Sequence, residues 1–490
     1  MKKFKNILIA IAAGTIILNS CATLDEDPVD FVDPQGFYQT EAQINAAMAS
    51  AWGFMAGYWQ DYSWNLYAWT RHADDLTIGG SLQLENLQQS LDRLWADYYR
   101  GINSMNNVLR ALDNVNLTQA DKDSFEGQVR FLRGFQYYSL TRFWGGVPLA
   151  TEDLTTEELQ TLERAPRDEV LALVVSDLEK AAPLLPASWP EGSGARPTEM
   201  TAKGLLATIY LNWATLTNSN ERYTKARDLA REVINSGQHQ LIQNVEEVFL
   251  KENKHASEFL FSVQRTGQFP SVSTDPQIWM PGEYLDGWGS FNVDTLLQNK
   301  YPDQPRRYAY LLVGTPEEDG TFTEFSDGRW YNRKYVPPYI PMEEYSTLTS
   351  SANTPLLRYP EILLTYAEAD NALSGPQQEA IDALNQVRDR ANGYVPNAEA
   401  PLLTLGSITK EEFEEEILNE RFFELCFEHV RIYDILRHRM LPEANPNNPD
   451  FDEGDYLYPI PLTEIEETEG RIKQNPGNYD DLGFGFFPSN

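Results

Sequence analysis

Three glutamates near the carboxyl end of the chain have a spacing that could serve catalysis. Glu420, Glu424 and Glu428 recur every four residues, which would place them on one face of a helix. Paired carboxylates can hydrolyse a glycosidic bond when a substrate fits between them. Arg421 and Arg431 lie within helical reach of these glutamates, so we favour structural ion pairs over a catalytic pair.

Other catalytic and metal-binding patterns do not fit the sequence. The five histidines have no metal-ligand spacing, and the acidic run 450–455 has a glycine where a calcium loop needs a ligand. We find neither a glycine-rich phosphate loop after an expected strand nor a G-x-S-x-G motif. We therefore expect no catalytic residues, no metal and no cofactor, and we expect the protein not to be an enzyme.

A first irregular stretch, residues 58–80, mixes aromatic and polar side chains without a helical pattern. It contains Trp64, Trp69, Arg71 and Asp74. Flat rings of this kind can cover the apolar face of a sugar while polar groups bind its hydroxyls. The alternative is a loop whose tryptophans pack back onto the core. The residues alone leave both open.

A second irregular stretch, residues 265–345, is rich in proline, glycine and aromatic residues. Its candidate binding residues are Trp279, Tyr284, Trp288 and Trp330. An irregular segment of this length inside a globular chain is usually functional. We expect tryptophans from the two stretches to meet on one exposed face.

One long helix organises the elements that must hold these stretches. Residues 126–149 are apolar on several sides of a helical pattern, which Gly145-Gly146 ends. A helix of this kind must be covered by neighbours. Arg130, Arg133 and Arg142 lie among its apolar residues, so each needs a carboxylate or backbone partner.

The remaining pattern is also mostly helical. We expect helices over 40–57, 81–112, 167–185, 198–213, 223–236, 357–373, 377–391 and 413–439. Paired helices with short turns indicate tetratricopeptide-like helical hairpins. The expected fold is therefore mainly α with a large irregular loop region, in a single domain from residue 40 to residue 490.

The amino terminus carries an export pattern. A basic segment precedes an apolar run over 7–18, and Ser20-Cys21 follows, which resembles a bacterial lipobox. We expect a signal peptide over 1–20, lipidation of Cys21 and a tether over 21–39. Ordinary cleavage beside an incidental cysteine is the alternative. No later stretch reads as a membrane span, so we expect attachment to the membrane by lipid only.

The composition narrows the range of partners. The formal net charge of −34 disfavours nucleic acid, whose binding depends on basic residues, and argues mildly against a strongly anionic ligand. Cys426 would be the one thiol left after lipidation, so no intramolecular disulfide is expected.

Several motifs, in this order, resemble the SusD/RagB family. They are GGVPL (145–149), ARPTEMTAKGLLATIYL (195–211), LLRYPEILLTYAEADNAL (356–373), the ER..EL..E..R..D pattern (420–434), YPIP (458–461) and QNPG (474–477). His429 stands where the family commonly has glycine. The resemblance covers nearly the whole chain, and it implies a cell-surface lipoprotein of the Bacteroidetes outer membrane.

By this resemblance, the protein captures an oligosaccharide or polysaccharide and delivers it to a SusC-like TonB-dependent transporter. The resemblance also implies that the two irregular stretches supply the glycan-binding site. A RagB-like member that binds peptide or protein is one alternative, because aromatic loops also serve peptides. A surface glycoside hydrolase is another, but it would require two placed carboxylates.

Overall fold

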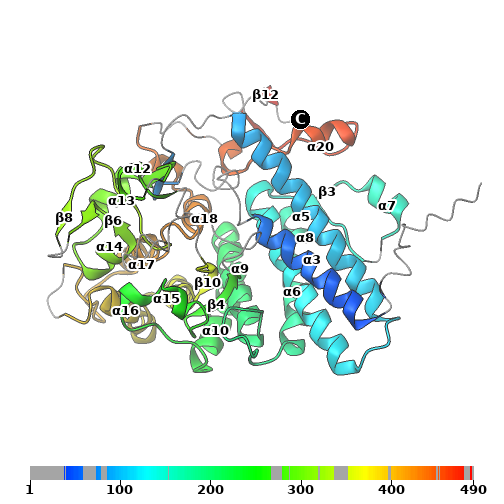
Figure 1. The fold of residues 1–490 in the computed structure, drawn as a ribbon, viewed down its shortest axis with the longest axis horizontal. Helices are drawn as coiled ribbons and strands as arrows, with labels where there is room; N and C mark the ends of the chain where they lie inside the picture. Colours follow the sequence, from blue (N-terminus) through cyan, green and yellow to red (C-terminus); the bar gives the residue numbers. More distant parts are fainter. Residues whose placement is uncertain are drawn as a thin grey trace, which may run out of the picture.

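The computed structural model describes residues 38, 40–58, 73–78, 85–152, 154–265, 279–285, 287–317, 321–335, 351–395, 399–447, 451, 453–478 and 486–487 (Figure 1). The longer helices are α3 (Glu41–Tyr58), α5 (Glu85–Leu112), α6 (Gln119–Trp144), α8 (Arg167–Ala181), α9 (Glu199–Thr217), α10 (Asn220–Asn235), α15 (Tyr359–Ser374), α16 (Gln378–Ala391) and α17 (Lys410–Glu424). Short helices are α7 (Thr156–Thr161), α12 (Gly282–Leu285), α13 (Thr295–Lys300), α14 (Pro305–Tyr310), α18 (Arg431–Arg437), α19 (Leu441–Ala444) and α20 (Leu462–Glu467).

The long helices pack on one another in chain order. Helix α3 contacts α5, α5 contacts α6, α6 contacts α8, and the series continues through α9 and α10 to α15, which also contacts α16 and α17. This sequential packing is what stacked helical hairpins produce. The prediction of a mainly α fold is confirmed. Among the described residues, no helix is both long enough and apolar enough to cross a membrane.

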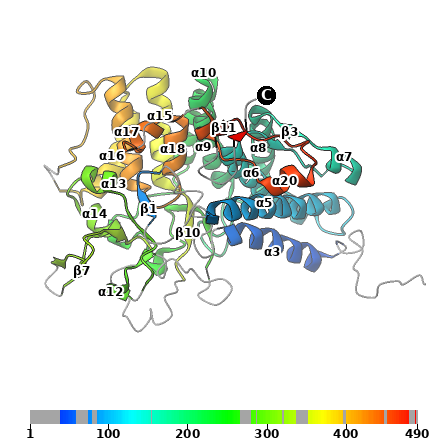
Figure 2. The same ribbon diagram turned by 90° about the horizontal axis from the view of Figure 1, so that it is seen from above.

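The strands are short and form two-stranded antiparallel pairs. The longest pair joins β4 (Phe259–Val263) to β10 (Thr354–Arg358), and a second joins β1 (Leu76–Ile78) to β5 (Phe291–Val293). The others are β2 (Val147–Pro148) with β3 (Arg164–Ala165), β6 (Leu311–Leu312) with β9 (Tyr331–Asn332), β7 (Thr315–Pro316) with β8 (Phe322–Thr323), and β11 (Gly477–Asn478) with β12 (Phe486–Phe487). Figure 2 shows α12 and β7 on one side of the molecule, with α15 and α16 on the opposite side.

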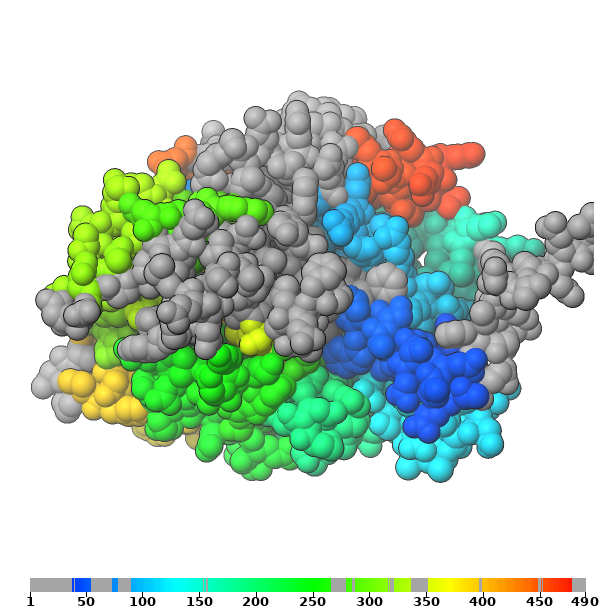
Figure 3. Space-filling view, viewed as in Figure 1, coloured from blue at the N-terminus to red at the C-terminus, as the bar shows by residue number. Residues whose placement is uncertain are grey.

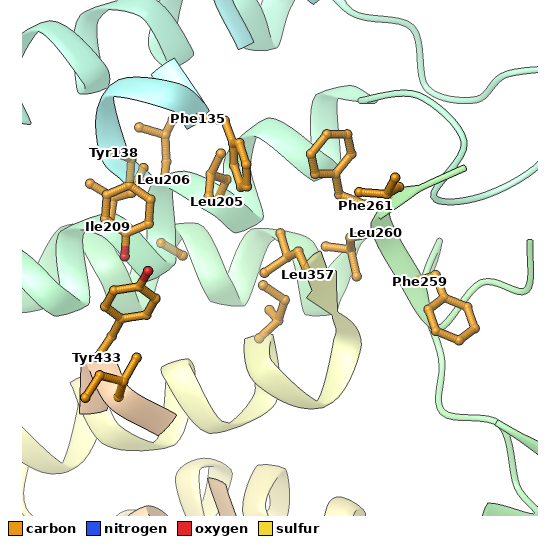
Figure 4. Close-up of a cluster of buried hydrophobic side chains, with 14 of the residues drawn as sticks. Phe135, Tyr138, Leu205, Leu206, Ile209, Phe259, Leu260, Phe261, Leu357 and Tyr433 are labelled. Atoms are coloured by element: carbon orange, nitrogen blue, oxygen red, sulfur yellow. The ribbon is translucent and has the colours of Figure 1, made fainter. Parts of the chain in front are cut away.

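Helix α6 forms where the sequence predicted the organising helix. Thr118 caps its start by accepting from the amide of Asp121, and Gly145, at φ 70°, ends it in a left-handed conformation that suits glycine. Its carboxyl-terminal Trp144 is buried and donates from Nε1 to the carbonyl of Pro459 at 2.9 Å. Phe135 and Tyr138, also on α6, pack in a larger apolar cluster with residues of α9, β4 and β10 (Figure 4).

The three arginines of α6 find different partners. Arg133 forms a bidentate pair with Asp177 of α8 at 2.7 and 2.8 Å, and Arg130 reaches the same carboxylate at 3.1 Å. Within the described residues, Arg142 has no carboxylate among its hydrogen-bond partners. Its guanidinium lies over the rings of Tyr138 and Tyr433, at 4.4 and 3.7 Å from their centroids. The prediction of carboxylate or backbone partners is therefore confirmed for two of the three.

The single helix predicted over 413–439 is wrong. Helix α17 ends at Glu424, α18 begins at Arg431, and Phe427 and His429 between them have φ values of 65° and 60°. Tertiary hydrogen bonds stabilise this break. The amide of Phe427 donates to Asp75, and the carbonyls of Glu424 and Cys426 accept from Lys334 Nζ at 2.7 and 2.8 Å.

A buried charge network occupies the junction of these elements. Glu424, which is 0% exposed, accepts from Arg306 at 2.9 Å, from Arg358 at 3.0 Å and from Arg390 at 2.6 Å. The network also includes Glu258, Glu420, Glu428, Lys334 and Arg388. Burial would raise the pKa of Glu424, but the surrounding cations outweigh burial and hold that pKa well below its usual range.

The network answers the question of catalysis by these glutamates. Glu420, Glu424 and Glu428 are all buried and paired with cations, and the one small cavity of about 30 Å³ that Glu428 lines in the described part of the chain is too small for a sugar ring. The prediction of structural ion pairs is confirmed, although the partners differ from those expected. Glu424 pairs with three distant cations, and Arg431 pairs with Asp74.

Replacing Glu424 with alanine leaves three buried cations without their shared carboxylate. We expect Glu424→Ala to lower the free energy of unfolding by about 3–5 kcal/mol, as for other buried pairs that lose one partner. Chemical denaturation measures this loss. Glu453→Ala is the control, because Glu453 is 83% exposed in its pair with Arg439, and a surface pair contributes about 1 kcal/mol or less. Equal stability of parent and Glu424→Ala would contradict the account of the network.

Candidate functional site

The two irregular stretches meet in the structure. Strand β1, from the first stretch, pairs antiparallel with β5, from the second, in the register Leu76↔Val293, Thr77↔Asn292 and Ile78↔Phe291. On the other side of β5, the amide of Val293 donates to the carbonyl of Trp330 at 2.8 Å. Three segments far apart in the sequence therefore lie side by side, and we call them the β1–β5 face.

Two aspartates anchor the first stretch to the helical body. Both carboxylate oxygens of Asp74 accept from Arg431 of α18, at 2.6 and 2.7 Å. Asp75 accepts from the amide of Phe427 at 3.0 Å. Burial raises the pKa of Asp75 to about 6, although the Phe427 amide opposes this rise. The left-handed turn between α17 and α18 thus presents the amide that holds β1.

A glycine-flanked turn presents Trp288 to solvent. The amide of Gly289 donates to the carbonyl of Met280 at 2.8 Å, and a Cβ added to Gly287 would lie 2.2 Å from that same carbonyl oxygen. Only glycine fits so close an approach. Trp288 is 52% exposed and is the most exposed tryptophan in the described part of the chain.

Polar groups lie on segments next to this turn. Glu283 of α12 accepts from the amide of Ser326 at 2.8 Å, and the hydroxyl of Tyr331 donates to Asp327 at 2.6 Å. The Tyr331 hydroxyl lies 3.6 Å from the point where a Cβ on Gly289 would stand. The Tyr331 hydroxyl is buried, whereas Glu283 and Asp327 are exposed, and a flat exposed ring with carboxylates on neighbouring segments matches the chemistry of a sugar site.

The other candidate residues have different positions. Trp279 is 1% exposed and packs on Phe291 and Phe427, with ring centroids 5.3 and 6.2 Å apart, so the expectation of an exposed ring is wrong for it. Asp74 is buried, and its carboxylate forms an ion pair with Arg431. It therefore anchors β1 and is not an exposed polar group. Both belong to the layer beneath the β1–β5 face.

Trp330 is half-buried, with the guanidinium of Arg307 at 4.6 Å from its ring centroid. Tyr284 lies on α12, and its side chain falls outside the described residues. Trp64, Trp69 and Arg71 also lie outside the described residues. In Figure 3 the green surface of residues 279–335 lies apart from the blue surface of α3.

No metal centre accompanies the β1–β5 face. Among the described residues, no group of three or more His, Cys, Asp or Glu side chains could hold a metal ion. Glu283 and Asp327 lie on segments next to the Trp288 turn but were not among the candidates predicted from the sequence. The flanking glycines of Trp288 were the one signal that could have distinguished this tryptophan from Trp279.

Two family models together match most of the chain. Residues 31–211 match the model described as starch-binding associating with outer membrane, and residues 216–450 match that of the SusD family. The chain belongs to the SusD/RagB family. It is 28% identical to SusD-like protein P2 of Formosa agariphila, over 97% of this chain and all of that protein.

Solved structures share this SusD/RagB fold. A SusD superfamily protein from Parabacteroides distasonis is similar with a TM-score of 0.75 and 23% identity, over 89% of this chain and 99% of the other. A laminarin-binding SusD-like protein is similar with a TM-score of 0.73 and 23% identity, over 90% of this chain and all of the other. The likeness establishes the fold throughout the helical body.

The anchoring of β1 generates a stability test. Asp74→Asn keeps the side-chain shape but removes the carboxylate that forms the ion pair with buried Arg431, so we expect the free energy of unfolding to fall by about 3 kcal/mol or more. Thr77→Val serves as the comparison, because it removes an exposed hydrogen bond from Thr77 to Asp294 and should cost about 1 kcal/mol. If thermal and denaturant unfolding of Asp74→Asn match the parent, the anchor does not exist as described.

Proposed function

We propose that this protein is an outer-membrane carbohydrate-binding lipoprotein that captures oligosaccharide and passes it to a SusC-like TonB-dependent transporter. The main observation behind this proposal is the exposed ring of Trp288. Gly287 and Gly289 form the turn that presents this ring next to the β1–β5 face. Membership in the SusD/RagB family and the fold shared with a laminarin-binding protein support the carbohydrate assignment. The matched starch-binding family description supports association with the outer membrane.

The proposed mechanism is capture without bond cleavage. The indole of Trp288 would cover the apolar face of one pyranose ring, and aromatic contacts of this kind are worth about 0.5–1.5 kcal/mol beyond the area they bury. Glu283 and Asp327 would accept from sugar hydroxyls. Because the chain carries a formal net charge of −34, we expect a neutral glycan at this face.

Alanine at Trp288 tests the binding face. We expect Trp288→Ala to weaken binding of laminarin or maltose oligosaccharides about fivefold or more, which corresponds to about 1 kcal/mol per stacked ring. Isothermal titration measures the affinity, and unfolding curves check that the variant is folded. Trp288→Phe, which retains a smaller ring, should fall between parent and alanine.

Leu405→Ala is the matched control, because Leu405 is exposed to a similar degree but lies outside the β1–β5 face. Its affinity should equal that of the parent. A Trp288→Ala protein that binds every oligosaccharide as tightly as the parent would refute the role of this ring. Binding of peptides but of no glycan in the same screen would favour the RagB-like alternative.

The lipid anchor has its own test at Cys21, which lies outside the described residues. We expect Cys21→Ala to leave the membrane fraction or to block maturation, because the acyl chains are attached to that sulfur. Fractionation and intact mass measure this. Cys426 is buried and cannot substitute as an anchor. An unchanged mass together with an unchanged membrane fraction would exclude lipidation at Cys21.

A further inference from the structure

A cavity lies away from the β1–β5 face, where α6, α8, α9 and α18 meet. Its volume is about 180 Å³, and none of its lining residues belongs to either irregular stretch. The buried residues Tyr138 and Ile209 line its inner end. The exposed residues Leu216, Arg439 and Glu453 line its mouth. The cavity therefore extends from the surface into the helical body.

Aromatic rings form much of the cavity wall. Figure 4 shows the hydroxyl ends of Tyr138 and Tyr433 pointing toward each other, with Ile209 beside Tyr138. Trp213 and Tyr456 also line the cavity. Such a lining can hold the flat or apolar body of a small molecule.

The arginines of the cavity are not all neutralised. Arg437 is saturated, because it pairs with both Glu368 and Asp434. Arg439 at the mouth pairs with Glu453 at 2.5 Å. Arg142 and Arg167 differ, because neither forms an ion pair with any residue in the described part of the chain.

Arg142 is held in its interior position mainly by ring contacts. Its guanidinium lies between the Tyr138 and Tyr433 rings, its Nη2 is 3.5 Å from Ser139 Oγ, and its Nε is buried without a hydrogen-bond partner. An uncompensated buried donor costs free energy of folding. Glu361 lies near enough to interact with this cation, but the structure shows no ion pair between the two, so Arg142 still contributes positive potential to the cavity.

Arg167 is in an unfavourable place for a structural cation. It is the first residue of α8, where the helix dipole disfavours positive charge, and its burial lowers its pKa despite the nearby Asp168. Asp168 is itself engaged, because its carboxylate accepts from Trp213 Nε1 at 2.8 Å. Neither the helix nor an ion pair therefore accounts for this arginine, whereas an anionic ligand would.

We propose that the cavity binds a small organic carboxylate. The carboxylate group pairs with Arg167, and Arg142 supplies a second positive charge. The body of the ligand packs against the tyrosine rings and Trp213. Guanidinium–carboxylate pairing is strong and directional, and it is strengthened in a partly enclosed site. This site is independent of the β1–β5 face, so its failure would leave the proposed glycan site untouched.

The test titrates the protein with two matched pairs of probes. D-glucuronate and phenylacetate carry the carboxylate, and D-glucuronamide and phenylacetamide are their uncharged counterparts. We expect one or both acids to bind at least about tenfold more tightly than the matching amide. The tighter acid shows whether the body is a sugar or an aromatic ring. Inorganic sulfate should bind more weakly than that acid, because it lacks an apolar body.

Variants connect the binding to the cavity. Arg167→Gln should abolish the preference for acid over amide while its thermal stability stays equal to or above that of the parent. Arg93→Gln removes the same charge from an exposed position on α5, and it should bind as the parent does. A folded Arg142→Gln protein should show a similar loss of the preference for acid over amide.

Four results would overturn the proposal. The first is no saturable binding of either acid. The second is equal affinity for an acid and its amide. The third is unchanged binding in a folded Arg167→Gln protein. Sulfate that binds as tightly as the better acid would also overturn it, because the site would then recognise charge alone.

Discussion

The structure depends on a set of ion pairs that are removed from water. Glu424 is shared by three guanidinium groups from α14, β10 and α16, and Glu258, Glu420 and Glu428 supply the other negative charges that these groups pair with. Buried ions are stable only when their partners and hydrogen bonds are complete, so this requirement fixes the relative positions of elements distant in sequence. The helical body is consequently joined to the irregular region by charge as well as by apolar packing.

The same requirement reaches the proposed binding face. Lys334, next to β9, donates to Glu428 and to two carbonyls of the turn after α17, while Phe427 in that turn donates to Asp75. The break between α17 and α18 is therefore a connection point rather than a defect. Through it, β1 and the segment that carries Lys334 gain fixed positions without a large sheet to support them.

The sequence allowed the helical body to be predicted, because α6 and the hairpins have strong apolar periodicity and glycine stops. It could not show the break after Glu424, since 425–430 has a helical pattern and only tertiary hydrogen bonds end the helix. It identified the glutamates as structural but not their partners, which lie up to 118 residues away. Composition also could not distinguish buried Trp279 from exposed Trp288, because the burial of each ring depends on its tertiary contacts.

The central claim is that the β1–β5 face, held by buried charge, binds carbohydrate. Hydrogen–deuterium exchange of the full protein, with and without a saturating oligosaccharide, tests it most directly. The account predicts slower exchange in residues 282–293 and 76–78, with little change in α9 and α10. Protection confined to the helical body, or no protection of the face by any oligosaccharide that binds, would contradict it.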